Sequence, residues 1–159
     1  MAAKSTDPRY RFGDLLALAR ASWVGQMEHR LDALGFTGYR RSDAAAMRLL
    51  HRGPIAIGRA ADVLGITRQA ARKGFEQLER RGYARTERDR DDARKLNVVL
   101  TASGEHYATA VIAVIEALNC ELCARVDRAE LLAADAVLRA ALADDATRER
   151  AARLVPPPG

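Results

Sequence analysis

The chain has 159 residues, 48% of them hydrophobic and 30% charged, so it can bury the core of one ordinary domain without disulfides or bound metal. Its net charge of +5 gives it a surface that attracts polyanions such as nucleic acid or anionic lipid. No apolar run is long enough to span a bilayer, and the first residues lack the apolar stretch of a secretory signal, so we expect a cytoplasmic protein that is not in a membrane. Two cysteines, Cys120 and Cys123, are too few for a disulfide framework and favour a reducing compartment.

Two helices are expected in the first third of the chain. Residues 1–10 are small and polar and are predicted to form a flexible arm. Residues 11–35 are predicted to form an amphipathic helix, because apolar residues recur every three or four positions at Leu16, Ala19, Trp23, Met27, Leu31 and Leu34. Ser42 is a candidate N-cap for a second, shorter helix, which Gly53 and Pro54 stop.

Two further helices joined by a tight turn follow. The first, over residues 58–64, stops at Gly65, and Thr67 caps the second, which runs to about Arg81 and is closed by Gly82. A short helix, a turn around a glycine and a second helix form the helix-turn-helix pattern. The apolar residues expected to face each other between these two helices are Ala61, Leu64, Ile66, Ala71, Phe75 and Leu78.

A β-hairpin is expected directly after the second of these helices. Residues 83–89 and 95–101 are typical of strands, and residues 90–94 are typical of a polar turn. A hairpin in this position is a wing. Residues 42–101 are therefore predicted to form a winged helix-turn-helix domain.

Helical spacing of apolar residues resumes after the hairpin. Residues 102–145 are predicted to form two helices, the second of which begins at Asp127 with Glu130 in a loose capping box. Residues 153–159, which contain three consecutive prolines, are predicted to be a tail. The expected fold class is mainly α with a small β-hairpin, a winged helix-turn-helix with helices on its N- and C-terminal sides.

The positive charge is concentrated in the second helix of the pair and in the wing. Between residues 68 and 95 there are ten basic and six acidic residues, a net +4 of the chain's +5. Arginine and lysine pair with guanine in a major groove, and glutamine pairs with adenine. An isolated helix with such side chains is more often a solvated surface, but the wing that follows favours contact with DNA. The hydrogen-bond donors on the first two turns of the second helix are Thr67, Arg68, Gln69, Arg72 and Lys73.

Between residues 57 and 107 four motifs follow one another: a helix-turn-helix, Leu-Glu-x-x-Gly, a wing with Asp-x-Arg, and Leu-Thr-x-x-Gly. Their anchor residues are Leu78, Glu79, Gly82, Asp92, Arg94, Leu100, Thr101 and Gly104. In this order the motifs resemble those of the MarR family of bacterial transcriptional regulators. The resemblance implies a sequence-specific regulator of transcription, a repressor relieved by a small ligand or another signal. It also implies binding to a near-palindromic site in double-stranded DNA as a homodimer, with no cofactor, metal ion or enzymatic activity.

The sequence departs from the family pattern in the wing and in the second helix. Arg90 and Ala93 stand where the family commonly has a proline and a second arginine. Gly74 lies inside the second helix, where it costs about 1 kcal/mol relative to alanine. Residues 70 and 71 are alanines where hydroxyl side chains are frequent, so we expect some hydrogen bonds to bases or phosphates to be missing.

The resemblance assigns roles to residues of the wing. Arg94 corresponds to an arginine that enters the minor groove, whose negative potential favours a guanidinium group. Arg88, Arg90 and Lys95 are expected to add contacts, and Asp92 is expected to orient the loop by hydrogen bonding. The alternative is an ordinary charged turn.

The resemblance also implies a dimer interface and a ligand pocket. Apolar residues of the terminal helices are suited both to a partner chain and to the core of one chain, and we expect both uses: Leu16, Ile112, Ile115, Leu131 and Leu138. Trp23, Met27 and Arg30 share one helix face by their spacing, and with His51 they would line a pocket for a small-molecule effector. The alternative is that Trp23 belongs to the core.

Two other functions are alternatives to this hypothesis. A winged helix can be a protein-interaction module without specific DNA binding, with its basic face docked on an acidic partner. A redox-sensing regulator would use Cys120 and Cys123, although buried, inert thiols are the expectation for this pair. An enzyme is not expected, because the sequence has no Ser/His/Asp set, metal cluster or phosphate-binding glycine loop.

Overall fold

The computed structural model describes residues 11–89, 92 and 96–154, and these residues are mostly helical. They divide into two compact units, Met1–Arg41 and Ser42–Gly159. The described part of the first unit forms one helix, α1 (Phe12–Ala33), which confirms the expected N-terminal helix. Gly35 follows it at φ +87°, and the N–H of Phe36 donates to the carbonyl of Leu31 at 2.9 Å, which closes the last turn. The arm predicted for residues 1–10 lies outside the described residues.

The second unit begins with α2 (Asp43–Leu50), followed by the two helices of the helix-turn-helix, α3 (Ile57–Leu64) and α4 (Arg68–Arg80). The prediction that Ser42 caps α2 with its side chain is wrong. Its backbone is already helical, at φ −74° and ψ −22°, and its hydroxyl makes no capping hydrogen bond. An N-cap side chain reaches the first N–H groups only from an extended backbone, so this hydroxyl is wrongly aimed.

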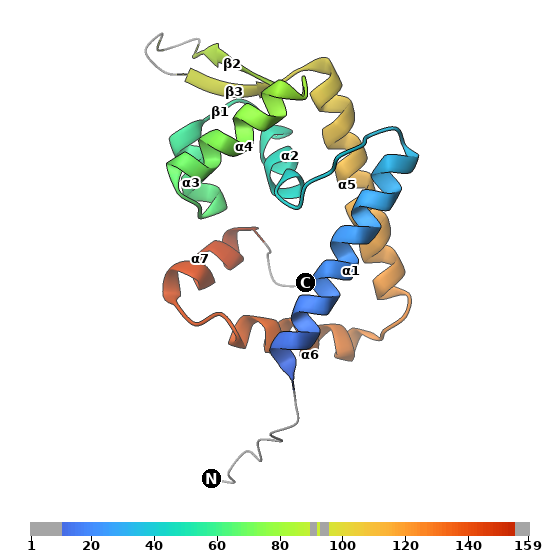
Figure 1. Cartoon of the computed structure of the whole chain (residues 1–159). Helices are drawn as coiled ribbons and strands as arrows, with labels where there is room; N and C mark the ends of the chain where they lie inside the picture. Colours follow the sequence, from blue (N-terminus) through green and yellow to red (C-terminus); the bar gives the residue numbers. More distant parts are fainter. Residues whose placement is uncertain (1–10, 90–91, 93–95, 155–159) are drawn as a thin grey trace. The chain divides into compact units, whose positions relative to one another are not determined.

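The wing is part of a sheet with three strands in the order β1-β3-β2 (Figure 1). The hairpin strands are β2 (Ala84–Arg88) and β3 (Leu96–Leu100), which are antiparallel, with Ala84 opposite Leu100. The sequence did not predict β1 (Ile55–Ala56), which pairs with β3 through Ile55 opposite Val98. Two residues are too few to show a strand period.

The C-terminal part forms α5 (Ala102–Cys123), α6 (Arg128–Ala140) and α7 (Asp145–Leu154). The capping box at the start of α6 is confirmed in both directions, with Asp127 accepting from the N–H of Glu130 at 2.8 Å. The prediction that residues 153–159 form a tail is wrong for residues 153 and 154, which belong to α7. The sequence analysis missed α7 because its Arg-rich segment has no apolar stripe, although Asp144 caps it by accepting from the N–H of Thr147 at 2.8 Å. Residues 155–159 lie outside the described residues.

The core of the second unit lies where α2 packs against α5 and β3 contacts both helices, and where α4 packs against α3 and β2. Its fully or almost fully buried side chains include Met47, Leu50, Phe75, Leu78, Val98, Tyr107 and Val111. The expectation that Ile66 lies between α3 and α4 is wrong, because the turn after Gly65 leaves its side chain 44% exposed. Within the described residues no single helix is both long and apolar enough to cross a membrane, and the pair α5 and α6 reaches that length and apolarity only with a bend of 117°.

Candidate nucleic-acid interface

The turn between α3 and α4 has the form that the sequence predicts. Gly65 ends α3 in the left-handed region at φ +64°, and the N–H of Ile66 donates back to the carbonyl of Ala61 at 3.1 Å. Thr67 then begins α4, and its Oγ1 accepts from the N–H of Ala70 at 3.1 Å. Because both helix ends are satisfied locally, α4 starts at a defined residue with its first turn intact.

The two faces of α4 differ in chemistry. Ala71, Phe75 and Leu78 are at most 3% exposed and hold the helix on the core. The opposite face is exposed and carries all five predicted donors: Thr67, Arg68, Gln69, Arg72 and Lys73. Three of these five side chains are positively charged, so α4 presents a basic surface of the kind that binds duplex DNA. Their contact with DNA remains a prediction.

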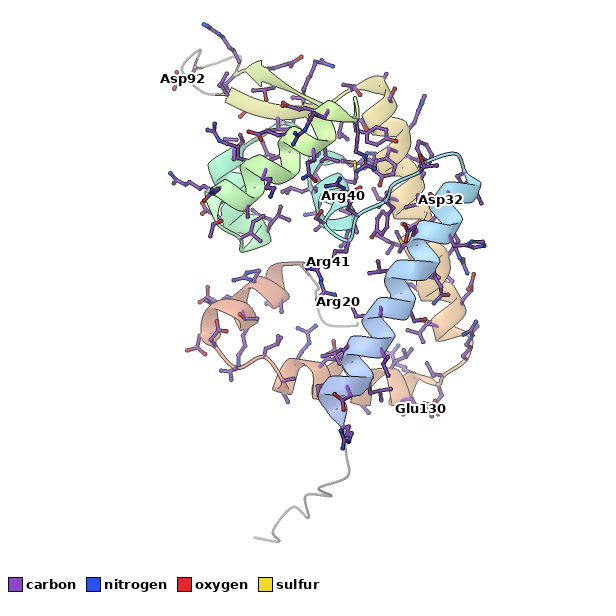
Figure 2. All side chains as sticks on the ribbon, in the orientation of Figure 1. Arg20, Asp32, Arg40, Arg41, Asp92 and Glu130 are labelled. Carbon is purple, nitrogen blue, oxygen red and sulfur yellow. The ribbon has the colours of Figure 1, made fainter. Side chains whose placement is uncertain are left out.

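An acidic residue orders the wing. The Oδ1 of Asp89 accepts from the N–H of Asp92 at 3.0 Å, and its Oδ2 accepts from Nδ2 of Asn97 at 2.7 Å. Asp89 therefore joins Asp92 to β3, whereas the sequence analysis gave the orienting role to Asp92. An aspartate three residues before a loop N–H is a common turn former, and this was the available signal. Figure 2 shows Asp92 at the outer end of the hairpin.

The described residues cover only part of the predicted wing site. Arg88 is exposed at the end of β2, opposite Leu96 in the register. Asp92 is half-buried. The other predicted wing residues lie outside the described residues: Arg90, Arg94 and Lys95.

The Leu-Glu-x-x-Gly motif joins α4 to the wing. Gly82 adopts φ +74°, and the N–H of Tyr83 donates to the carbonyl of Leu78 at 2.9 Å, which closes the C-terminus of α4. The carboxylate of Glu79 accepts from the hydroxyl of Thr86 on β2 at 2.5 Å. The motif thus ends the helix and fixes the first wing strand to it.

The Leu-Thr-x-x-Gly motif holds α5 against the same junction. The hydroxyl of Thr101 donates to the carbonyl of Gly82 at 2.6 Å, and the same oxygen accepts from the N–H of Gly104 at 3.0 Å. Gly104 lies so close to Tyr83 that a Cβ on Gly104 would be 1.8 Å from the carbonyl oxygen of Tyr83. The glycine is required here because the backbone of α5 touches the backbone after α4.

A buried charged group, which the sequence analysis missed, lies beneath the end of α4. We call Asp43, Arg81 and Tyr107 the Arg81 cluster. Nη1 of Arg81 donates to Oδ2 of Asp43 at 2.6 Å, and Nη2 donates to the hydroxyl of Tyr107 at 3.4 Å. The hydroxyl of Tyr107 donates to the same Oδ2 of Asp43 at 2.8 Å.

Burial and hydrogen bonds together set the ionisation of Arg81 and Tyr107. Asp43 is 3% exposed and Tyr107 is fully buried, with its ring stacked on that of Tyr83 at 4.4 Å. Burial raises the pKa of Tyr107, and the negative charge of Asp43 raises it further. Burial alone would lower the pKa of Arg81, but the hydrogen bonds to Asp43 and Tyr107 outweigh it and the pKa is raised. Arg81 therefore stays charged and Tyr107 stays neutral at ordinary pH.

The residues predicted for a dimer interface differ in exposure. Leu16 and Leu138 are 44% and 45% exposed, and Ile112, Ile115 and Leu131 are half-buried. The expectation that both thiols are buried is wrong, because Cys120 and Cys123 are exposed at the end of α5. Helical spacing predicted that they share one helix but not which way that end of the helix faces. No group of three or more His, Cys, Asp or Glu side chains suited to a metal ion occurs in the described part of the chain.

The residues predicted for a ligand pocket come from both units. On α1, Met27 is buried, and Trp23 and Arg30 are half-buried. His51 follows α2 in the second unit and is exposed, with Nδ1 3.1 Å from a carboxylate oxygen of Glu105. The grouping of these four residues into one pocket stays a prediction.

A helix-turn-helix with an exposed basic second helix, followed by a hairpin, defines a winged helix-turn-helix protein. Residues 37–95 match the model of the MarR family. No curated protein sequence matches the chain.

Several solved structures have a similar fold at low sequence identity. MepR of S. aureus, solved as a DNA complex, is 18% identical with a TM-score of 0.68, over 82% of this chain and 95% of MepR. FabT of Streptococcus pneumoniae, also in complex with DNA, is 17% identical with a TM-score of 0.69, over 80% and 90%. The PcaV transcriptional regulator of Streptomyces coelicolor, in complex with its natural ligand, is 18% identical with a TM-score of 0.66, over 87% and 95%.

Proposed function

We propose that this protein is a transcription regulator that binds duplex DNA in a sequence-specific manner. The observation that carries the proposal is the division of α4 into a buried apolar face and an exposed face with three cations and two further donors. A helix of this kind, held at a defined first residue and followed by a wing, suits insertion into a major groove. The similar folds of MepR and FabT, both solved with DNA, support the same function. Such a regulator acts in the cytoplasm, where the DNA is.

The proposed regulator acts as a homodimer. Large apolar side chains are exposed on the terminal helices, including Leu15 and Leu18 on α1 and Leu132, Val137 and Leu138 on α6. Exposed apolar clusters of this kind mark protein interfaces. A twofold assembly would place two α4 helices in successive major grooves about 34 Å apart, so we expect a near-palindromic site.

We further propose that the regulator is a repressor relieved by a small ligand or another signal. PcaV, which has a similar fold, was solved with its natural ligand. Trp23, Met27, Arg30 and His51 remain the candidates for contact with an effector. No enzymatic activity is proposed for this chain.

The function is tested by selecting bound fragments from the genomic DNA of the source and measuring affinity for them. Retention of a few fragments, with log K falling by about 0.9 per log unit of salt for each phosphate contacted, is the expected result. The variant Arg72→Gln should weaken binding to a selected fragment by at least about tenfold, which is the scale of one good base contact. Arg125→Gln, which removes the same charge after the end of α5, is the matched control. Uniform retention of all fragments would instead favour a protein-interaction module.

Exposure of the two cysteines favours one second candidate, a redox-sensing form of the same regulator. Residues three apart in a helix have Cα atoms about 5 Å apart, within the range of a disulfide. A hydroperoxide would oxidise one thiolate to a sulfenic acid, releasing an alcohol or water, and the second thiol would then displace water to form the disulfide. Mild peroxide should weaken binding to the selected fragment. A Cys120→Ser, Cys123→Ser protein that still responds would rule out this candidate.

A further inference from the structure

The C-terminal end of α4 is held by charged hydrogen bonds rather than by apolar packing alone. Arg81 is the C-cap of α4, and its guanidinium group reaches Asp43 on α2 and Tyr107 on α5. These two partners are 38 and 26 residues away along the chain and lie on helices outside the helix-turn-helix. The Arg81 cluster therefore fixes α4 to the rest of the second unit at one point.

The hydrogen bonds of Arg81 have fixed directions. A planar guanidinium group donates along fixed directions, and each of its two Nη groups has its own acceptor here. The two acceptors are themselves joined, because the hydroxyl of Tyr107 donates to Asp43. The guanidinium carbon also lies 4.9 Å from the ring centre of Tyr83 and 5.3 Å from that of Tyr107. A rotation of the Arg81 side chain thus breaks several contacts at once. Apolar side chains, in contrast, could slide past their neighbours and stay in contact.

The length of α4 amplifies any rotation at this end. A helix of 13 residues is about 20 Å long, so a tilt of about 5° at Arg81 moves the first turn by nearly 2 Å. Hydrogen bonds to base edges fail at displacements well below that distance. Contacts from long arginine and lysine side chains to phosphates persist, because those side chains can adjust.

We propose that Arg81, acting through Asp43 and Tyr107, is the positioning residue that sets the angle of α4 and so the sequence specificity of DNA binding. This inference rests on the proposed function. The Arg81 cluster would act through the position of α4, because its hydrogen bonds lie inside the protein. Its loss should lower the affinity for the specific site and leave the affinity for random duplex DNA in place.

The experiment compares three variants of the full-length protein. Tyr107→Phe removes one hydroxyl and keeps the buried ring. Arg81→Lys keeps the charge but loses the two-pronged donor. Arg80→Lys is the matched control, because Arg80 is exposed and, among the described residues, its Nε donates within its own helix, to the carbonyl of Glu76 at 3.3 Å. Affinities are measured on a selected genomic fragment and on a random duplex of the same length at several salt concentrations.

We expect Tyr107→Phe and Arg81→Lys each to weaken binding to the selected fragment about tenfold, the effect of one lost hydrogen bond to a charged group. Affinity for the random duplex and the salt dependence should change less than twofold. Arg80→Lys should bind both duplexes as the parent does. A loss of the same factor on both duplexes, or no loss on the selected fragment, would overturn the proposal.

A second measurement separates this inference from the proposed function. Hydrogen exchange without DNA should be faster for amides in the last turn of α4 in Tyr107→Phe and Arg81→Lys than in Arg80→Lys. If the parent protein does not distinguish the two duplexes, the proposed function fails, and the exchange rates still decide whether Arg81 anchors α4. Unchanged exchange in both variants would refute the anchoring itself.

Discussion

The two elements proposed to meet DNA are attached to the molecule in different ways. The helix α4 ends on the buried Arg81 cluster, where Asp43 is 3% exposed. The inner part of the wing is buried through Val98 on β3, but its outer part is held together by exposed or half-buried polar contacts, such as that between Asp89 and Asn97 and that between Arg85 and Glu87. The comparison teaches that a helix that contacts base edges and a wing that adapts to the DNA need different supports. Buried charges resist rotation, while solvated contacts can break and reform at little cost.

The largest expected effect is the loss of stability when the buried Arg81 cluster is broken. Asp43→Ala leaves the guanidinium group of Arg81 partly buried without its carboxylate, and breaking such a pair costs about 3–5 kcal/mol. The free energy of unfolding, measured by denaturant titration at neutral pH, should fall by that amount. Glu87→Ala removes an exposed carboxylate from Arg85 and should cost less than about 1 kcal/mol. Equal losses for the two variants would erase the distinction between helix and wing.

The next largest effect on stability is expected where the backbone of Gly104 on α5 touches that of Tyr83. Gly104→Ala places a Cβ 1.8 Å from the backbone oxygen of Tyr83, which cannot rotate away as a side chain can. We expect a loss of about 3 kcal/mol in the free energy of unfolding, at the upper end for overpacking. Gly74→Ala is the control on α4, where nothing lies within 4 Å of the added Cβ, and it should stabilise the protein by about 1 kcal/mol. A destabilised Gly74→Ala protein would show that the exposed face of α4 is not open.

The pH dependence of stability tests the same cluster without changing its shape. The folded state raises the pKa of Tyr107 above its unfolded value near 10, because burial and Asp43 oppose the phenolate. This contribution is therefore fully present below about pH 10 and is lost as the pH rises further. Unfolding measured from pH 8 to 11 should show the parent losing stability relative to Tyr107→Phe at the alkaline end. Parallel curves for the two proteins would contradict the raised pKa.

The sequence predicted those parts of the fold that depend on local signals. Gly65 and Thr67 mark the helix-turn-helix, and their roles follow from backbone conformation and capping within three or four residues. The exposed donors of α4 were found in the same way, because apolar residues at helical spacing fix which face is left for solvent. Such inferences need no knowledge of distant contacts.

The remainder depended on partners far along the chain. Asp43 lies in the first turn of α2, where an aspartate ordinarily serves the helix dipole, and its partner Tyr107 is 64 residues away. Nothing near Asp43 in the sequence indicates burial. Likewise β1 has only two residues and exists because β3 is beside it, and the exposure of Cys120 depends on what packs on the end of α5.

The smallest expected change in stability belongs to the wing. Asp89→Ala removes the acceptor for the N–H of Asp92 and for Nδ2 of Asn97, both near the surface. The free energy of unfolding should change by less than about 1 kcal/mol, because water replaces these contacts. Hydrogen exchange at the Asp92 amide should nevertheless become faster, because its acceptor is gone, while amides in α4 exchange as before. A loss of several kcal/mol would instead mean that the outer end of the wing is held as firmly as α4, and that its support is not adaptable.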